Sequence, residues 1–241
     1  MFRNKKVSVI FPVYNEKENI KNAIEQFFLE PSVDEVIAVD NNSTDGSADE
    51  IKKTRAVYIL ERTQGYGAAL QAGLKKATGD ILITVEPDGT FRANDLERFL
   101  IYSSDYDVVF GTRTSRTPVW SGANMDFSMR IGNWFVAKLL EYLNNGPSFT
   151  DVGCTYKLIH RYAYEKIKST LKVNGNWFSP EFMLRCLENN LSTVEIPVFY
   201  GVRIGTSKIT GKKWPAIKLG FRMIIFIITE RFKRLWSKTT L

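Results

Sequence analysis

The sequence is poor in the residues that bind zinc or form disulfides. It has one histidine, His160, and two cysteines, Cys154 and Cys186. No C-x-x-C spacing indicates a zinc site, and two cysteines are too few for a disulfide framework. We therefore expect reduced thiols. His160 follows an apolar stretch without a partner motif, and we expect it to be structural.

The sequence also has no long hydrophobic run. Residues 1–6 lead straight into an expected strand, without the apolar core of a signal peptide. The longest uncharged run near the C-terminus, residues 223–229, is far shorter than the roughly 20 residues that span a bilayer. No repeat or low-complexity linker is present. We expect a protein of the cytoplasm or of the cytoplasmic face of a membrane.

Acidic residues are scarce in the last part of the chain. Residues 201–241 contain ten Lys or Arg and one acid, Glu230, whereas the rest contains 23 bases and 25 acids. A basic tail on a nearly neutral body indicates an anionic surface as partner, and not nucleic acid along the whole protein. The 241 residues are enough for one large domain with a core.

Short apolar runs alternate with helical patterns along the first half of the chain, which predicts a parallel, doubly wound α/β sheet. The expected strands are residues 7–11, 36–39, 56–60, 81–85, 108–110, 151–159 and 193–200. The expected helices are residues 16–29, 68–77, 94–102, 130–143, 180–189 and 214–236. Asn15 is the expected N-cap of the first helix.

The last of these helices has a wide apolar face rimmed by bases. This pattern suits a helix that lies in the plane of a membrane surface. A helix packed on the protein core would show a similar pattern. The sequence leaves both interpretations open.

Two carboxylates follow the expected strand at residues 81–85. Pro87 cannot donate a hydrogen bond to a sheet, so the strand must end there, and Gly89 supplies the turn. Glu86 and Asp88 are thereby presented at the carboxyl end of the sheet, where α/β folds bind ligands. Carboxylates this close repel each other unless a cation or a shared proton intervenes. A divalent cation that also holds phosphates would compensate both carboxylates.

Other polar residues follow the first two strands. Pro12, Tyr14 and Glu16 end the first, where an aromatic ring can stack on a base and a carboxylate can accept hydrogen bonds. Asp40 ends the second, the place of a ribose-binding acid in dinucleotide folds. The turn after it, residues 43–46, is expected to act only as a turn and helix cap.

Gly65 and Gly67 open the expected helix at residues 68–77. Glycines there let a ligand approach the backbone at a helix start, where N–H groups favour phosphate. Ala69 and Gly73, further along, are expected to serve close packing.

These motifs resemble, in order and spacing, those of the family 2 glycosyltransferases. The matching segments of the first half are VSVIFPVYNE (7–16), VDNNSTDGS (39–47), GYGAALQAGLKKATGD (65–80), the triplet 86–88 and GTR (111–113). In the second half DVGCTYKLIHR (151–161), FSPEF (178–182) and RIGTSK (203–208) look most like the polyprenyl-phosphate branch, typified by dolichol-phosphate mannosyltransferases.

The resemblance implies a GT-A fold, a Rossmann-like three-layer α/β fold with a mostly parallel central sheet, plus the C-terminal amphipathic helix. It implies a glycosyltransferase domain over residues 1–210 and a basic, membrane-associated helix over residues 211–241.

The resemblance also assigns roles to the acidic triplet and the first loops. Asp88 occupies the second acidic position that coordinates Mg²⁺ or Mn²⁺ on the donor diphosphate. Glu86 stands where relatives usually carry Asp, and Thr90 where they often carry Gln. The residues implied in nucleotide-sugar binding are Pro12, Tyr14, Glu16, Asp40, Gly65, Gly67, Glu86, Asp88, Arg203 and Lys208.

Basic residues of the second half would hold anionic groups. Arg113 and Arg130 resemble positions that bind the acceptor phosphate or the diphosphate. Arg203, Ser207 and Lys208 resemble a basic loop that closes over the diphosphate, with Gly205 giving it freedom. Glu181 sits where the family places an acid near the acceptor, and Asp151 is either a second such acid or a strand cap.

The implied activity is inverting, metal-dependent transfer of a sugar from GDP-mannose or a UDP-sugar to a polyprenyl or dolichyl phosphate at the cytoplasmic membrane face. A separate membrane-spanning subunit would be a further partner. The alternatives are transfer to a sugar hydroxyl, with Glu181 or Asp151 as base, and a non-catalytic nucleotide-sugar sensor. Sugar nucleotidyl transfer is disfavoured, because residues 11–15 lack a glycine-rich basic loop.

Overall fold

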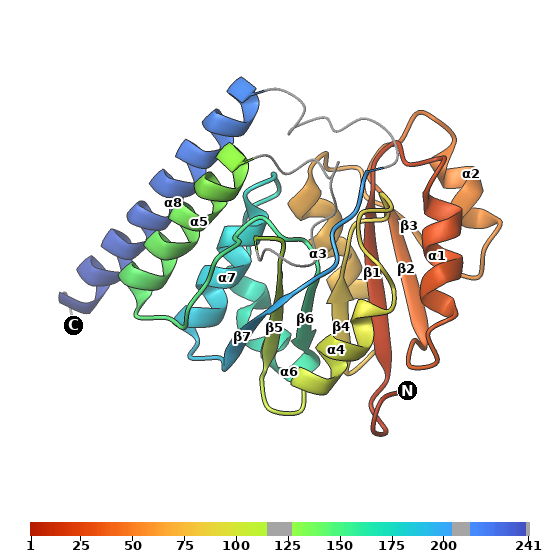
Figure 1. Ribbon diagram of the computed structural model, residues 1–241, viewed down its shortest axis with the longest axis horizontal. Helices are drawn as coiled ribbons and strands as arrows, with labels where there is room; N and C mark the ends of the chain where they lie inside the picture. The colour runs from red at the N-terminus through yellow and green to blue at the C-terminus, as the bar shows by residue number, and fades with distance from the viewer. Residues whose placement is uncertain (115–126, 204–212, 240–241) are drawn as a thin grey trace.

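The computed structural model describes residues 1–114, 127–203 and 213–239. Figure 1 shows one central sheet with helices on both faces and two helices, α5 and α8, side by side at one end. The expected α/β architecture is confirmed.

Seven strands form the sheet, in the order β3-β2-β1-β4-β6-β5-β7. Only β6 is antiparallel to its neighbours, so the other six strands point the same way. Their bounds are β1 Val7–Val13, β2 Glu35–Asp40, β3 Val57–Leu60, β4 Ile81–Thr84, β5 Val108–Thr112, β6 Lys157–His160 and β7 Thr193–Pro197.

Helices make up the two outer layers. The eight described α-helices are α1 Ile20–Phe28, α2 Ser47–Lys52, α3 Tyr66–Lys76, α4 Asp95–Tyr102, α5 Phe127–Asn144, α6 Arg161–Ile167, α7 Phe178–Glu188 and α8 Lys213–Thr239. A 3₁₀ turn, Lys168–Thr170, follows α6.

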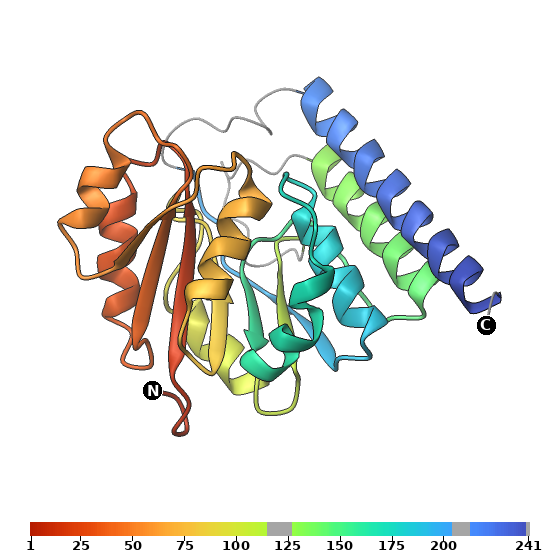
Figure 2. The same cartoon turned by 180° about the vertical axis from the view of Figure 1, so that it is seen from behind.

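Successive strand residues supply two cores, one on each face of the sheet, because side chains alternate along a strand. Ile10 and Ile37 belong to the core under α3, α5, α6 and α7. Val9 and Val36 belong to the core under α1, α2 and α4. In Figure 2, α3, α6 and α7 cover the face that is turned away in Figure 1. The three-layer arrangement is thus confirmed.

Strand β1 runs two residues further than expected, through Pro12. It pairs with β4 only as far as Ile10, while its pairing with β2 continues to Val13. The Val13 carbonyl accepts the Asn41 N–H on the β2 side. Pro12 therefore turns its missing N–H toward the side where β4 has already ended, and no ladder bond is lost.

The expected start of the first helix was wrong. Asn15 has φ +55°, and its side chain accepts the N–H of Thr44 in the neighbouring loop, so it does not cap a helix. The helix begins at Ile20. Helices α2 and α6 were not expected, and β6 and β7 are shorter than the apolar runs that predicted them.

The lone histidine and the two cysteines lie in the core. His160 is buried, and its Nε2 lies 2.8 Å from the Ser103 carbonyl oxygen. Burial lowers the pKa of His160. Cys154 and Cys186 are both buried and free. The structural role expected for His160 is confirmed.

Helix α8 packs on the body along one side and exposes the other. Met223 and Ile227 are buried, and Glu230 lies 2.5 Å from Arg185 of α7. The opposite side of α8 exposes large apolar side chains, among them Trp214 and Phe221. The interpretation as a helix packed on the core is confirmed for the buried side, and the interpretation as a membrane-surface helix stays a prediction for the exposed side. Among the helices that the structure describes, none is long and apolar enough to cross a membrane.

Gly73 is required for the packing of α3 on the sheet. A Cβ there would lie 2.3 Å from Ile10 Cγ2 and 3.0 Å from Val39 Cγ2, as expected for a packing glycine. Gly73→Ala should lower the free energy of unfolding by about 1–3 kcal/mol through overpacking. Urea denaturation would measure the loss.

Gly132 on α5 is the matched control, since a Cβ there meets nothing within 4 Å. Gly132→Ala should stabilise the protein by about 0.5–1 kcal/mol through helix propensity. Equal effects of the two substitutions would contradict the packing argument.

Candidate functional site

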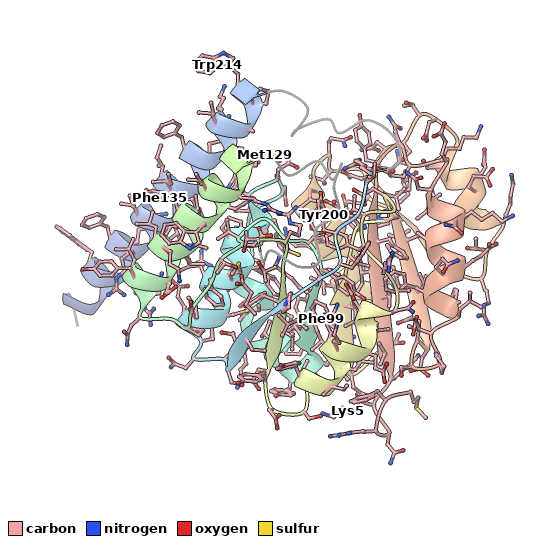
Figure 3. The ribbon with its side chains drawn as sticks, viewed as in Figure 1. Lys5, Phe99, Met129, Phe135, Tyr200 and Trp214 are labelled. Atoms are coloured by element: carbon pink, nitrogen blue, oxygen red, sulfur yellow. The ribbon has the colours of Figure 1, made fainter. Side chains whose placement is uncertain are left out.

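The strand directions bring the candidate residues to one edge of the sheet. Strands β1, β4, β5 and β7 all end there. Glu16 follows β1, and Glu86 and Asp88 follow β4. Arg113 follows β5, and Arg203 follows β7. Because β6 runs the opposite way, the turn before it, residues 151–154, lies at the same edge. Figure 3 shows Tyr200, just after β7, at this end of the strands.

Arg203 joins the first and fourth strand ends. Its Nη2 lies 2.6 Å from Glu16 Oε1, and its Nη1 lies 3.0 Å from Asp88 Oδ2. The other oxygen of Asp88 accepts hydrogen bonds from the N–H and hydroxyl of Thr90. Asp88 is 1% exposed. One guanidinium thus compensates two carboxylates that lie far apart in the sequence.

Glu86 carries the most perturbed carboxyl of the site. Burial and the neighbouring Asp88 charge raise the pKa of Glu86 to about 7, against the opposing effect of Arg203 and Arg113. Crowded carboxylates resist full ionisation in this way. The expected repulsion within the triplet is therefore present, and Arg203 relieves it only in part.

Arg113 is held by Asp151 in a two-pronged ion pair. Nε lies 2.8 Å from Oδ2, and Nη2 lies 3.0 Å from Oδ1. Asp151 also accepts the backbone N–H groups of Arg113 and Gly153. Despite complete burial, these contacts lower the pKa of Asp151. Asp151 is therefore the fixed counter-ion of Arg113 and is engaged on both oxygens.

Sequence reasoning missed two tyrosines of the site. Burial raises the pKa of Tyr66, and so do the charges of Glu86 and Asp88. Burial likewise raises the pKa of Tyr200, whose ring centroid lies 5.2 Å from the guanidinium carbon of Arg113. The one local signal was that Tyr66 stands between Gly65 and Gly67.

Gly65 and Gly67 allow a close contact with the loop before α7. A Cβ on Gly65 would lie 2.1 Å from the Asn174 carbonyl oxygen, and one on Gly67 would lie 2.2 Å from that of Val173. Gly65 also has φ +148°. The Asn174 carbonyl accepts the Ala68 N–H at the start of α3. The loop before α7 thus packs against the start of α3, and the role of Gly65 and Gly67 in nucleotide-sugar binding stays a prediction.

Glu181 holds this loop. It is fully buried, and its two oxygens accept the backbone N–H groups of Lys172 (3.0 Å) and Val173 (2.8 Å). A carboxylate bound to two amides inside the protein is not placed to take a proton from an acceptor. The structure thus argues against the expected role of Glu181 near the acceptor.

The remaining candidates, Asp40 and Arg130, form no ion pair with the acidic residues or arginines described above. Asp40 accepts hydrogen bonds from the Ser43 N–H and the Tyr58 hydroxyl. Arg130 lies on α5 and forms no ion pair with another residue of the described ranges. Their predicted roles in binding stay predictions.

The first loop presents an aromatic ring beside the acidic residues. Tyr14 is 40% exposed at the end of β1, whereas Pro12 is buried within the strand. Ser43 and Asp45 accept backbone N–H groups of residues 15 and 17 in the loop after β1, and Asp45 also accepts the Ser47 N–H at the start of α2, as expected for a helix cap. Gly205, Ser207 and Lys208 lie outside the described residues.

The acidic pair fits a divalent cation whose other ligands are water molecules or substrate phosphates. Within the described ranges, no group of three or more His, Cys, Asp or Glu could hold a metal. Glu86 and Asp88 could supply two carboxylates, and the repulsion between them that Arg203 leaves uncompensated favours a cation. Mg²⁺ commonly binds one or two carboxylates together with substrate phosphates and water.

The sequence matches the family model described as Glycosyl transferase family 2 over residues 8–168. The chain therefore belongs to glycosyl transferase family 2, and the resemblance noted in the sequence is confirmed.

Two matching relatives are undecaprenyl-phosphate 4-deoxy-4-formamido-L-arabinose transferases. The Serratia proteamaculans protein is 29% identical over 67% of this chain and 51% of its own length. The Pectobacterium atrosepticum protein is 27% identical over 85% of this chain and 62% of its own length. The chain thus spans about half to two thirds of these relatives. An uncharacterized protein of Methanocaldococcus jannaschii is 29% identical over 86% of this chain and 88% of its own length.

Solved structures share the fold. Glucosyl-3-phosphoglycerate synthase of Mycobacterium tuberculosis, in complex with Mn²⁺, UDP and glucosyl-3-phosphoglycerate, superimposes with a TM-score of 0.71. The match covers 95% of this chain and 80% of that protein at 16% identity. The same enzyme with Mg²⁺ and UDP gives a TM-score of 0.72. The GT-A fold expected from the resemblance is confirmed.

The raised pKa of Glu86 predicts a pH-dependent stability. The folded protein binds this proton more tightly than the unfolded chain, whose pKa is 4.5, so stability falls as the pH rises from 4.5 through about 7. Glu86→Gln removes the ionisation. In metal-free buffer it should raise the free energy of unfolding at pH 8 by about 2–3 kcal/mol.

Urea denaturation at pH 8 and pH 4.5 would measure this gain. At pH 4.5 most of the difference between the variant and the original protein should disappear. A gain of equal size at both pH values would show that charge at Glu86 is not its cause.

Proposed function

We propose that this protein transfers a sugar from a nucleotide-sugar to a polyprenyl phosphate, with Mg²⁺ or Mn²⁺, at the cytoplasmic face of a membrane. The observation that carries the proposal is the charge pattern at the sheet edge. Two carboxylates one residue apart lie beside two arginines, Arg113 and Arg203, each already oriented by a carboxylate. Such a site suits a diphosphate and a second phosphate held together.

The donor side would be formed by the ends of β1 and β4. Glu86 and Asp88 would hold the metal, which when bound neutralises the charge that develops on the departing nucleoside diphosphate. Arg203 would leave Asp88 and turn to the diphosphate, because one guanidinium N–H cannot serve the Asp88 carboxylate and the diphosphate at the same time. Tyr14 and Asp40 would contact the nucleoside.

The acceptor side would be formed by Arg113. Asp151 fixes this guanidinium through Nε and Nη2, which orients it for an anion. A phosphate oxygen of the acceptor would attack the sugar carbon C1 in line, opposite the diphosphate, with inversion of its configuration. Two nearby cationic side chains would keep the two anionic reactants together.

The hydrogen bonds of Glu181 and Asp151, the two candidate bases, bear on whether the acceptor is a sugar hydroxyl or a phosphate. Transfer to a sugar hydroxyl would need a carboxylate base near that hydroxyl. Glu181 is committed to two backbone amides, and Asp151 is committed to Arg113. A phosphate acceptor is already an anion and needs no strong base. This favours a lipid phosphate over a sugar hydroxyl.

The exposed sides of α5 and α8 suit a membrane surface. Their exposed large apolar side chains are Ile131, Trp134, Phe135 and Tyr142 of α5 and Trp214, Ile217, Phe221, Ile225, Phe232 and Trp236 of α8. In Figure 3, Trp214 points away from the body of the molecule. Exposed Lys218, Arg222 and Lys233 accompany them. Aromatic side chains with nearby bases favour an anionic bilayer interface.

A transfer assay tests the proposed reaction. With Mn²⁺ or Mg²⁺, labelled nucleotide-sugars and undecaprenyl phosphate in detergent, we expect label in a butanol-soluble product. Asp88→Asn should lower the rate at least about 100-fold, since it removes charge stabilisation in the transition state. Lys166→Met, an exposed lysine of α6, serves as the control. Nucleotide-sugar binding without any product would favour the non-catalytic alternative.

Vesicle flotation tests the membrane face. The full chain should bind vesicles that contain phosphatidylglycerol and should bind neutral vesicles more weakly. The double variant Phe135→Ser, Phe221→Ser should lower the bound fraction about tenfold or more, since each large apolar side chain contributes roughly 1.5–3 kcal/mol. Leu29→Ser, an exposed apolar residue after α1, is the control. Unchanged binding of the double variant would rule out this face.

A further inference from the structure

Lys157 is a buried lysine that the proposed reaction does not use. It stands at the start of β6 and is 5% exposed. Its Nζ donates to the Cys154 carbonyl and to Ser179 Oγ, the latter at 2.9 Å. Neither acceptor carries a charge, and burial lowers the pKa of Lys157. A buried ammonium without an ion-pair partner is costly, and an apolar side chain would avoid that cost.

Ser179, at the start of α7, completes the arrangement. It accepts from Lys157 and donates its own hydroxyl hydrogen to the Val152 carbonyl. Together the two side chains bind the alternate carbonyls of Val152 and Cys154. Both carbonyls belong to the turn 151–154, which carries Asp151 at its start.

The other side of this turn holds Arg113. Asp151 binds Arg113, and the Gly153 N–H donates to Asp151 Oδ1 at 2.9 Å. A Cβ on Gly153 would lie 2.8 Å from Arg113 Nη2, so the guanidinium lies directly against the turn. Any shift of the turn therefore moves the guanidinium.

We propose that Lys157 and Ser179 are positioning residues that fix the turn 151–154 so that Asp151 presents Arg113 to an anionic group of the substrate. Glu195 of β7 fixes the entrance of the turn, since its carboxylate accepts the N–H groups of Thr150 and Asp151. Lys157 and Ser179 fix its exit. The ammonium is retained because it supplies directed donors to two acceptors at once, which no apolar side chain can do.

The direct test follows the Nε–H of Arg113 by NMR in protein labelled with ¹⁵N-arginine, after its signal has been assigned by its loss in Arg113→Lys. Lys157→Met and Ser179→Ala should each increase the solvent exchange of this hydrogen about tenfold, the size expected when one hydrogen bond to a charged group is weakened. The melting temperature is recorded alongside. Lys166→Met is the matched control and should leave the exchange unchanged.

A purely structural role gives a different result. Lys157→Met and Ser179→Ala would then lower the melting temperature while the exchange at Arg113 stayed as in the original protein. That outcome overturns the proposal. If Lys157→Met does not fold, Ser179→Ala decides alone, because it keeps the buried ammonium with its bond to the Cys154 carbonyl and removes only the two hydrogen bonds of the Ser179 hydroxyl, to Lys157 and to the Val152 carbonyl.

A second measurement rests on the proposed function, since it assumes that Arg113 binds phosphate. Inorganic pyrophosphate with Mg²⁺ is the probe, titrated by calorimetry. Lys157→Met should weaken its affinity about tenfold in the original background and should have no further effect in Arg113→Ala, because it acts through Arg113. Equal effects in both backgrounds overturn the proposal. Absence of pyrophosphate binding by the original protein would contradict the proposed function, and the NMR result would still decide the role of Lys157.

Discussion

Charge compensation at one edge of the sheet is the constraint on which the site depends. Three carboxylates, Glu16, Glu86 and Asp88, meet where β1 and β4 end, and a single guanidinium, Arg203, contacts two of them. The third stays poorly compensated, which the raised pKa of Glu86 expresses. A cation and an anion that arrive together, such as a metal with a diphosphate, can satisfy all of these groups. Either one alone leaves a charge unmatched.

The reversed strand β6 makes the second half of the site. Because it runs against its neighbours, the turn that precedes it reaches the edge where the other strands end. That turn brings Asp151 to Arg113 after β5, and so links two segments 38 residues apart. The loop before α7 is fixed at the same edge by Glu181 and the glycines that open α3. Buried polar groups of the second half thus fix the position of Arg113 and of the loop before α7 at this edge.

The sequence was sufficient for features whose cause is local. Pro87 and Gly89 end a strand and turn the chain, so the position of the acidic triplet at the carboxyl end of β4 could be predicted, and the alternation of apolar runs predicted the sheet. Contacts between distant segments could not be predicted in the same way. Nothing near Glu16 indicates its partner Arg203, 187 residues away. The contacts of Gly65, Gly67 and Glu181 with the loop before α7 could not be predicted either, because their motifs indicated only roles toward a ligand.

Pro12 has a consequence for what can bind beside β1. Beyond Ile10 this strand has lost β4 as a neighbour, and a free strand side is a template onto which another chain can add. Proline offers that chain no N–H, so an added strand would lack a hydrogen bond at its first step. The stretch of β1 nearest the acidic residues, which is buried in the folded protein, thereby offers no backbone donor to a foreign strand even where β4 no longer covers its side.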